Sequence, residues 1–300
     1  MRRTLDLLVA EKEFDAVYVH LFRMAQYVTD HRGIYRIADL TDVISQEIAL
    51  SLPYRTAIWR MIYRLEMPRI RRCEVETANT CEETWLISAR DREELRGRSG
   101  SSNIQVVPNG VEFDVFRPEP AARREKHVLF VGHLGVPHNV DAVQFLVDDI
   151  FPRVWQRMPE CTLEIAGAGA GRRVLGLHRP PSVTVSGFVD DLNGALNRAS
   201  VFVAPLRFSA GIQNKVLEAM AAGLPVITTR RVADGLEARD GSEVLVANEP
   251  DAIAEATVSL LRDPDIRARM GRAAAEFVRN RYQWDHLLKR CRYIDEELLR

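Results

Sequence analysis

The sequence predicts an α/β protein whose 300 residues form two domains, each built on a parallel sheet. In the C-terminal half, short apolar or β-branched runs alternate with helical patterns such as 140–158. A join at 109–126, rich in proline and charge, is typical of a hinge. One helical pattern begins directly past a strand end, where ligands bind in parallel sheets. The runs in this half are 127–134, 161–166, 183–188, 201–206, 225–229 and 243–247.

The N-terminal half has the same alternation with fewer strands. A helical region at 54–80 lies between the second and third of them. The candidate strands are 14–20, 35–40, 85–89 and 104–107. We therefore expect a partial Rossmann-like domain over 1–118 and a complete one over 119–281. The last segment, 282–300, has the pattern of an amphipathic helix.

The segment after the run 201–206 carries the strongest functional signal. It enters a helix that ends at Gly223, and a helix start just past a strand offers free N–H groups to an anion. Arg207 and Lys215 place two cations beside that start. Glu218 is the lone acid in an otherwise apolar helix, which is costly unless something binds it. Cations and a helix start suit a diphosphate, and a carboxylate suits sugar hydroxyls.

Spacing alone leaves an alternative open. Lys215 and Glu218 lie three residues apart and can pair on a surface. Arg207 can equally be a solvated loop residue.

Several segments together resemble one known family. The run Gly-Ile-Gln-Asn-Lys-Val-Leu-Glu-Ala-Met at 211–220 strongly resembles the nucleotide-sugar motif of glycosyltransferase family 4, which has the GT-B fold. Its form is most similar to bacterial sugar transferases associated with exopolysaccharide and exosortase loci. The other matching segments are 109–111 with 116–118, 130–134, 137–143, 185–189 and 282–284. The resemblance implies two Rossmann-like domains and a final helix that crosses back to the first domain.

The sequence departs from the family pattern in three places. Ala210 stands where many members carry a first glutamate, so Glu218 remains alone. The loop after Gly132 has no Arg or Lys, and we expect Arg207 to supply that charge. The chain also starts near what would be the fourth strand of the first domain, so we expect an incomplete N-terminal sheet. Such a sheet has an exposed edge that favours association with a second copy.

The resemblance implies further contacts with a nucleotide-sugar donor. We expect a backbone contact from Gly132, for which an ordinary strand-ending turn is the less favoured alternative, and a glycine-lined rim near the nucleotide at Gly167. We expect base contacts from the segment that begins at Gly187, which can equally be a plain strand end. The glycines at 167–171 lack the full spacing of a dinucleotide fingerprint. The expected donor residues are Gly132, Gly167, Gly187, Phe188, Val189, Gly211, Ile212, Gln213, Asn214 and Glu218.

In the N-terminal half, Asp42 follows a predicted strand. It stands near the point where many relatives place a histidine that meets the sugar. Asp42 can take that role, and the favoured alternative is that it caps the next helix. His20 ends another strand and can line the cleft, although the favoured alternative is a structural role.

No metal or cofactor is expected. Asp263 and Asp265 match a metal-binding Asp-x-Asp pattern, but Pro264 between them indicates a helix start with Asp263 as its cap. The four cysteines lack metal-ligand spacing and weakly suggest a reducing cytoplasm. A net charge of −1 gives no basic field for nucleic acid.

Membrane contact is the last open question. No apolar run is long enough to span a bilayer. The region 54–72 carries six arginines and an apolar stripe, which can lie on anionic lipid at the inner membrane surface. The favoured alternative is a helix packed on the sheet with a solvated basic face. The stripe is Ile58, Met61, Ile62 and Leu65.

These observations predict a glycosyltransferase that moves a sugar from a UDP- or GDP-sugar to a saccharide or lipid-linked acceptor. By resemblance it retains anomeric configuration and serves polysaccharide or glycolipid biosynthesis. The predicted catalytic residues are Lys215, Arg207 and Asp42, with Lys215 and Arg207 neutralising the departing diphosphate. The alternatives are a catalytically incomplete nucleotide-binding module or partner subunit, and a nucleotide-sugar epimerase.

Overall fold

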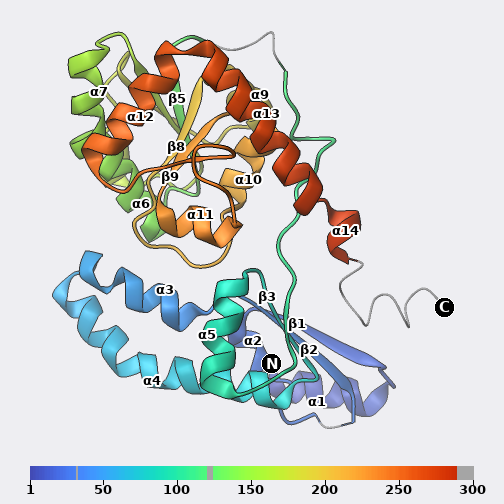
Figure 1. The fold of residues 1–300 in the computed structure, drawn as a ribbon. Helices are drawn as coiled ribbons and strands as arrows, with labels where there is room; N and C mark the ends of the chain where they lie inside the picture. Colours follow the sequence, from blue (N-terminus) through green and yellow to red (C-terminus); the bar gives the residue numbers. More distant parts are fainter. Residues whose placement is uncertain (32, 120–123, 289–300) are drawn as a thin grey trace. The chain divides into compact units, whose positions relative to one another are not determined.

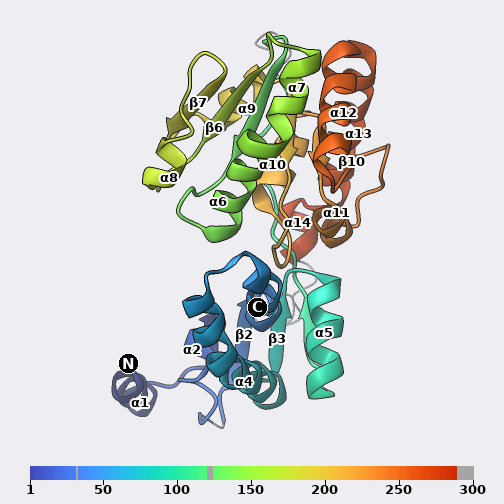
Figure 2. The ribbon, with the colours of Figure 1, turned by 90° about the vertical axis from the view of Figure 1, so that its left-hand side faces the viewer.

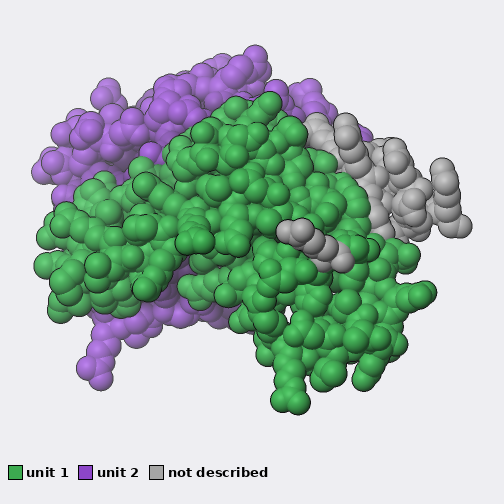
Figure 3. Space-filling view, turned by 90° about the horizontal axis from the view of Figure 1, so that it is seen from below, with its two compact units in different colours: residues 1–108, 210–212 green, residues 109–209, 213–300 purple. Residues whose placement is uncertain are grey.

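The chain divides into two units, each with its own parallel sheet, in a computed structural model that describes residues 1–31, 33–119 and 124–288. Unit 1 is 1–108 with the loop 210–212, and unit 2 is 109–209 with 213–300 (Figure 3). The predicted α/β class with two parallel sheets is confirmed. The predicted domain limits stay a prediction. The expected crossing of the segment 282–300 lies mainly outside the described residues.

Unit 1 has four parallel strands in the order β1-β2-β3-β4 (Figure 1). The strands are β1 (Ala16–His20), β2 (Tyr35–Thr41), β3 (Glu83–Leu86) and β4 (Ile104–Val106). The helices are α1 (Arg2–Glu11), α2 (Phe22–Ala25), α3 (Ile44–Ser51), α4 (Ala57–Thr80) and α5 (Ala89–Ser99), with a 3₁₀ turn at Leu52–Tyr54.

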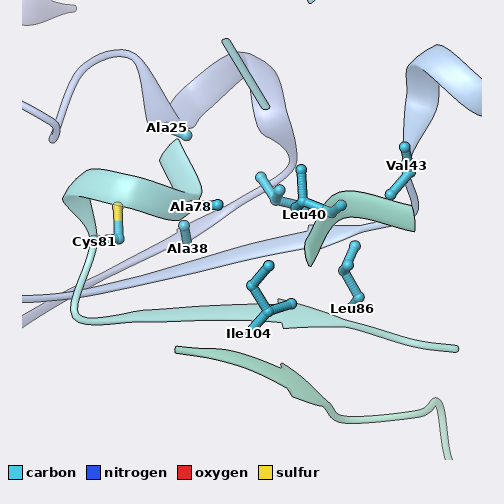
Figure 4. Close-up of a cluster of buried hydrophobic side chains, with 9 residues drawn as sticks. Ala25, Ala38, Leu40, Val43, Ala78, Cys81, Leu86 and Ile104 are labelled. Carbon is cyan, nitrogen blue, oxygen red and sulfur yellow. The ribbon is translucent and has the colours of Figure 1, made fainter. Parts of the chain in front are cut away.

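The core of unit 1 lies between the sheet and the second half of α4. Leu40 of β2, Leu86 of β3 and Ala78 of α4 are at most 1% exposed and belong to one apolar cluster (Figure 4). Ser88 caps α5 by accepting a hydrogen bond from the Asp91 amide, and Gly100 ends that helix in the left-handed conformation.

Unit 2 has six parallel strands in the order β10-β9-β8-β5-β6-β7. The strands are β5 (His127–Val131), β6 (Thr162–Ala166), β7 (Val183–Gly187), β8 (Val201–Ala204), β9 (Val226–Thr228) and β10 (Leu245–Val246). The central strands β5, β8 and β9 are buried along their whole length because helices cover both faces of the sheet (Figure 2). The strand order reverses between β5 and β8, and in such sheets this switch point is where ligands bind.

The helices of unit 2 follow the expected alternation. Asp263 caps the long helix α13 by accepting from the amides of Asp265 and Ile266, so its predicted capping role is confirmed. The helices are α6 (Pro137–Gln144), a π-helical turn (Phe145–Ile150), α7 (Phe151–Arg157), α8 (Arg172–Leu175), α9 (Leu192–Arg198), α10 (Asn214–Ala221), α11 (Arg230–Leu236), α12 (Pro250–Arg262), α13 (Pro264–Arg281) and α14 (Trp284–Leu288).

One expectation about unit 1 is wrong. The favoured alternative packed the apolar stripe of α4 on the sheet. In the structure Ile58, Met61 and Leu65 are 60–69% exposed, and the buried residues of α4 are Glu74, Thr77 and Ala78. The helix is held by its second half, so the stripe of its first half is left in solvent.

Candidate functional site

Two glycine loops meet at the carboxyl ends of β5 and β6. Gly167 has a φ of +141°, and a Cβ there would lie 1.8 Å from the carbonyl oxygen of Gly132. The Leu134 amide donates to the Ala168 carbonyl over 2.7 Å, and the Gly167 amide donates to the Gly187 carbonyl over 2.6 Å. The structure therefore brings Gly132, Gly167 and Gly187 together. The backbones at 132 and 167 approach so closely that no side chain fits at 167.

The end of β7 is open by contrast. Gly187 has a φ of +71°, and apart from its chain neighbours no described heavy atom lies within 4 Å of the position that a Cβ would take. Phe188 is 72% exposed and Val189 is half-buried. An exposed aromatic ring beside the strand ends offers a flat apolar surface, of the kind on which a base stacks.

Lys215 lies in the first turn of α10, past the end of β8. Its Nζ donates to Asn139 Oδ1, approaches Gln213 Oε1 at 3.4 Å and lies 5.6 Å from the centroid of the Phe130 ring. Burial lowers the pKa of Lys215 to about 8, and the negative charge of Glu218 only partly offsets this. In the described part of the chain no ion pair joins Lys215 to Glu218. The surface pair that spacing left open is not formed.

Glu218 is one turn further along α10. Burial raises the pKa of its carboxyl, and the charge of Lys215 opposes that rise. A half-buried carboxylate of this kind gains when hydroxyl groups donate hydrogen bonds to it. Its place fits the predicted contact with sugar hydroxyls, which stays a prediction.

Asn139 is a site residue for which the sequence predicts no role. It lies in the first turn of α6, is 3% exposed, and donates through Nδ2 to the His133 carbonyl over 3.0 Å while accepting from Lys215. A Cβ on Gly132 would lie 2.9 Å from Asn139 Cγ. Asn139 thus ties the glycine loop after β5 to the lysine of α10.

Arg207 is neither a solvated loop residue nor an unmatched charge. Its Nε and Nη2 donate to the two carboxylate oxygens of Asp141 over 2.9 and 2.5 Å. Its guanidinium carbon lies 4.5 Å from the centroid of the Phe145 ring. The bidentate pair of Arg207 and Asp141 is neutral as a unit. This weakens the expectation that Arg207 supplies the positive charge that the loop after Gly132 lacks. Asp141 is the second residue to which the sequence assigns no role.

The helix α10 begins at Asn214. Gln213 is the N-cap and no side-chain hydrogen bond caps the helix there. Asn214 Oδ1 accepts from Asn109 Nδ2 over 2.9 Å. Gly211 and Ile212 group with unit 1, where the Gly211 amide donates to Asp91 Oδ2 over 3.1 Å. The Gly211 amide is therefore paired within unit 1, and the predicted donor contacts of Gly211 and Ile212 stay predictions.

Asp42 in unit 1 does not cap α3, so the favoured capping prediction is wrong. Val43 is the N-cap, and the Ser45 amide donates to Glu74 Oε1 over 2.9 Å. Asp42 Oδ1 is buried with no hydrogen-bond partner among the described residues. Burial, followed by the negative charge of Asp91, raises the pKa of Asp42 to about 8. Its carboxyl can therefore hold a proton at neutral pH.

The His20 side chain contacts Asp39 of the neighbouring strand β2. Its Nδ1 lies 3.0 Å from Asp39 Oδ2, which also accepts from the Tyr18 hydroxyl over 2.6 Å. Across the described ranges no three His, Cys, Asp or Glu side chains gather to hold a metal ion. No helix among those described is both long and apolar enough to cross a membrane.

The site in unit 2 falls within a region that matches a known family. Residues 125–263 match the family described as "Glycosyl transferases group 1". The phosphatidyl-myo-inositol mannosyltransferase of Mycobacterium tuberculosis is 31% identical over 199 residues, which are 62% of this chain and 51% of that protein. A GDP-mannose-dependent alpha-(1-6)-phosphatidylinositol monomannoside mannosyltransferase of the same organism is 28% identical over 210 residues, covering 62% and 54%. The chain thus spans about half the length of these relatives.

Solved structures support the fold across nearly the whole chain. Sucrose-phosphate synthase from Thermosynechococcus elongatus matches with a TM-score of 0.82 at 17% identity, covering 99% of this chain and 77% of that one. Anabaena Alr3699/HepE, in complex with UDP and glucose, matches with a TM-score of 0.76 at 13% identity, covering 98% and 80%. The resemblance to glycosyltransferase family 4 and the GT-B fold class predicted from the sequence are confirmed.

Proposed function

We propose that this chain, a GT4-like protein of the GT-B fold, transfers a sugar from a nucleotide-diphosphate donor to an acceptor hydroxyl. One observation carries the proposal: Lys215 is held, half-buried, by a neutral amide at the strand ends of a doubly wound sheet. A cation that burial disfavours, and that forms no ion pair with a carboxylate of the described residues, is suited to an anionic ligand.

The chemistry follows from this placement. As the bond between the anomeric carbon and the diphosphate breaks, negative charge grows on the leaving oxygen. Protonated Lys215 and the uncapped start of α10 stabilise that charge in place, and Glu218 accepts hydrogen bonds from ribose hydroxyls. The acceptor hydroxyl then bonds to the anomeric carbon and its proton leaves with the diphosphate. We propose retention of configuration, so that the bond forms on the face from which the diphosphate departs.

Donor and acceptor are proposed only as classes. One relative is named as GDP-mannose-dependent, and HepE is solved with UDP, so the donor is a UDP- or GDP-sugar. The relatives act, by their names, on phosphatidylinositol glycolipids, and we propose a saccharide or lipid-linked acceptor on the cytoplasmic side. Asp42, whose carboxyl can hold a proton at neutral pH, is proposed to hydrogen-bond the transferred sugar.

Calorimetric titration with UDP and with GDP tests the proposal directly. We expect one of them to bind the wild-type chain, and Lys126→Ala to bind it equally, because Lys126 is exposed and pairs with Glu160 before β5 begins. Absence of binding by both nucleotides would remove the proposal. Binding without sugar transfer to any hydroxyl acceptor would instead assign a nucleotide-binding module, and conversion of the donor to its epimer would assign the epimerase.

Nucleotide affinity is expected to weaken as pH rises above about 8. Because the pKa of Lys215 in the ligand-free protein is about 8, the lysine is mostly protonated at pH 7 and binds the diphosphate there without proton uptake. Above pH 8 the lysine is mostly neutral, so binding requires the uptake of a proton. Each further pH unit then costs about tenfold in affinity until the pKa of the complex is reached. Lys215→Arg should give a flat profile over the same range, since arginine stays protonated. Identical profiles in titration calorimetry would exclude Lys215 as the titrating group.

Asn139→Ala is expected to weaken nucleotide binding about tenfold. The substitution removes the acceptor that holds Lys215 and leaves the His133 carbonyl without its donor. Asn139→Asp separates positioning from a purely structural role, because the added carboxylate should raise the pKa of Lys215. The pH at which affinity begins to fall should then move upward, as measured by the same titrations. An unmoved profile would contradict direct contact with Lys215.

A further inference from the structure

A cavity of about 580 Å³ lies in unit 2 at the amino ends of β5, β6 and β7. These parallel strands form one side of the sheet (Figure 2), with β7 at its edge. Their amino ends lie opposite the carboxyl ends, which carry Gly132 and Gly167. The volume is typical of a site that holds a small molecule. The proposed transfer reaction does not use this end of the sheet.

Buried polar side chains form one wall of the cavity. His127, the first residue of β5, is 6% exposed, and its Nε2 lies 3.0 Å from Glu164 Oε2 on β6. Its Nδ1 lies 2.9 Å from Thr162 Oγ1, and the Ser186 hydroxyl donates to Glu164 Oε1 over 2.6 Å. The His127 hydrogen bond, followed by that from Ser186, lowers the pKa of Glu164 to about 2, although burial opposes this. Apolar side chains would fill this part of a sheet at lower cost, so packing alone does not explain the buried pair.

Two arginines line the same cavity without a carboxylate partner. Arg198 ends α9 and is half-buried, and Arg124 precedes β5 and is exposed. The Arg124 amide donates to the Arg198 carbonyl over 2.8 Å, so the two side chains begin at neighbouring points. Neither guanidinium group forms a hydrogen bond or ion pair within 1–31, 33–119 and 124–288, and Arg198 acts on Glu164 through its charge only. Two such groups beside one cavity are suited to a phosphate.

The other polar groups of the lining are suited to hydroxyls. The Thr184 hydroxyl of β7 has no hydrogen-bond partner in the described part of the chain, and the Glu125 carboxylate is exposed and forms no ion pair there. Both can hydrogen-bond hydroxyl groups of a ligand. Pro180 and Pro181 add an apolar side, against which ring carbons can pack.

We propose that this cavity binds a small hydroxylated organic phosphate of the size of a sugar phosphate. Arg124 and Arg198 would hold the phosphate group, while Thr184 and Glu125 would hydrogen-bond the hydroxyls. Inorganic phosphate fits less well, because it would leave Thr184 without a partner and place an anion beside Glu125 alone. Since the cavity lies at the amino ends of the strands, its ligand is distinct from the nucleotide-sugar donor.

Titration calorimetry of the full chain with glucose, mannose and fructose 6-phosphates tests the site. We expect at least one of them to bind, more tightly than inorganic phosphate, and free glucose not to bind. Arg124→Ala and Arg198→Ala should each weaken sugar-phosphate binding about tenfold or more. Thr184→Val should weaken it about fivefold and leave the binding of inorganic phosphate unchanged. A melting temperature within about 2 °C of wild type checks that each variant is folded.

Matched controls separate this cavity from other basic surfaces and from the nucleotide site. Arg269→Ala with Arg272→Ala removes two exposed arginines of α13, one of which lines another cavity of unit 2. Lys215→Ala removes the lysine past the carboxyl end of β8. Both should bind the sugar phosphate as the wild type does.

Four outcomes would overturn the proposal. They are no binding by any of the three sugar phosphates, equal affinity for inorganic phosphate, wild-type binding by the Arg124 and Arg198 variants, and an equal loss in either control. None of these readouts needs a nucleotide, so the result is independent of the proposed sugar transfer.

Discussion

Lys215→Ala is expected to lower donor turnover at least tenfold, a loss of about 1.4 kcal/mol or more in transition-state stabilisation. The ammonium group is the charge nearest the start of α10 that no carboxylate neutralises in the described site. Its loss leaves the departing diphosphate with helix-end amides alone. Release of nucleoside diphosphate from the sugar donor measures the effect.

The same substitution should not destabilise the ligand-free protein. Burial lowers the pKa of Lys215, so at neutral pH its charge opposes folding, and this opposition fades as pH rises from about 8 to the unfolded value. Removing the charge relieves that cost and offsets the lost contact with Asn139. Lys126→Ala serves as the control for lysine loss elsewhere. A turnover rate equal to that of the wild type would remove Lys215 from the mechanism.

Gly167→Ala is expected to destabilise unit 2 by about 3 kcal/mol and to lower its melting temperature by roughly 6–12 °C. The new Cβ would lie 1.8 Å from the Gly132 carbonyl oxygen, and a φ of +141° is unfavourable for alanine. The backbone must move, and the two glycine loops lose their hydrogen bonds. Calorimetric scans report the stability, and nucleotide titration reports the site.

Gly171→Ala is the matched control on the same loop. Apart from its chain neighbours, no described heavy atom lies within 4 Å of the position its Cβ would take, and the backbone there is extended. Its melting temperature should stay within about 2 °C of wild type. If Gly167→Ala has the same melting temperature as Gly171→Ala, the close approach of the two glycine loops does not contribute to the stability of unit 2.

Local sequence patterns are sufficient to predict the strands, and they place the candidate site whose residue roles stay predictions. The alternation of apolar runs locates β5 to β9, and the motif at 211–220 locates the start of α10 to within a few residues. Asp263 is recognisable as a cap because cap, proline and helix are adjacent in the chain.

The partners of the site residues are not predictable in this way. Asn139 meets Lys215, and Asp141 meets Arg207, across wide separations in sequence. Spacing within a segment cannot show which residues of another helix will face it. The signal available in the sequence is an Asn and an Asp two residues apart at the start of a helix that follows a glycine loop, because such polar side chains need partners where they are buried. The capping prediction for Asp42 fails for a related reason: Glu74, from α4, takes the amide that a cap would bind.

The pairing of β5 with β8 has a consequence for how the protein reaches its native state. Val128 aligns with Val201, so the two central strands can join only after the intervening β6 and β7 units have been synthesised. Contacts of such long range close slowly and late. A nascent chain that ends before Val201 would leave β5 with a bare edge, and the ligand corner could not yet exist. Formation of the ligand corner is therefore coupled to completion of the central sheet.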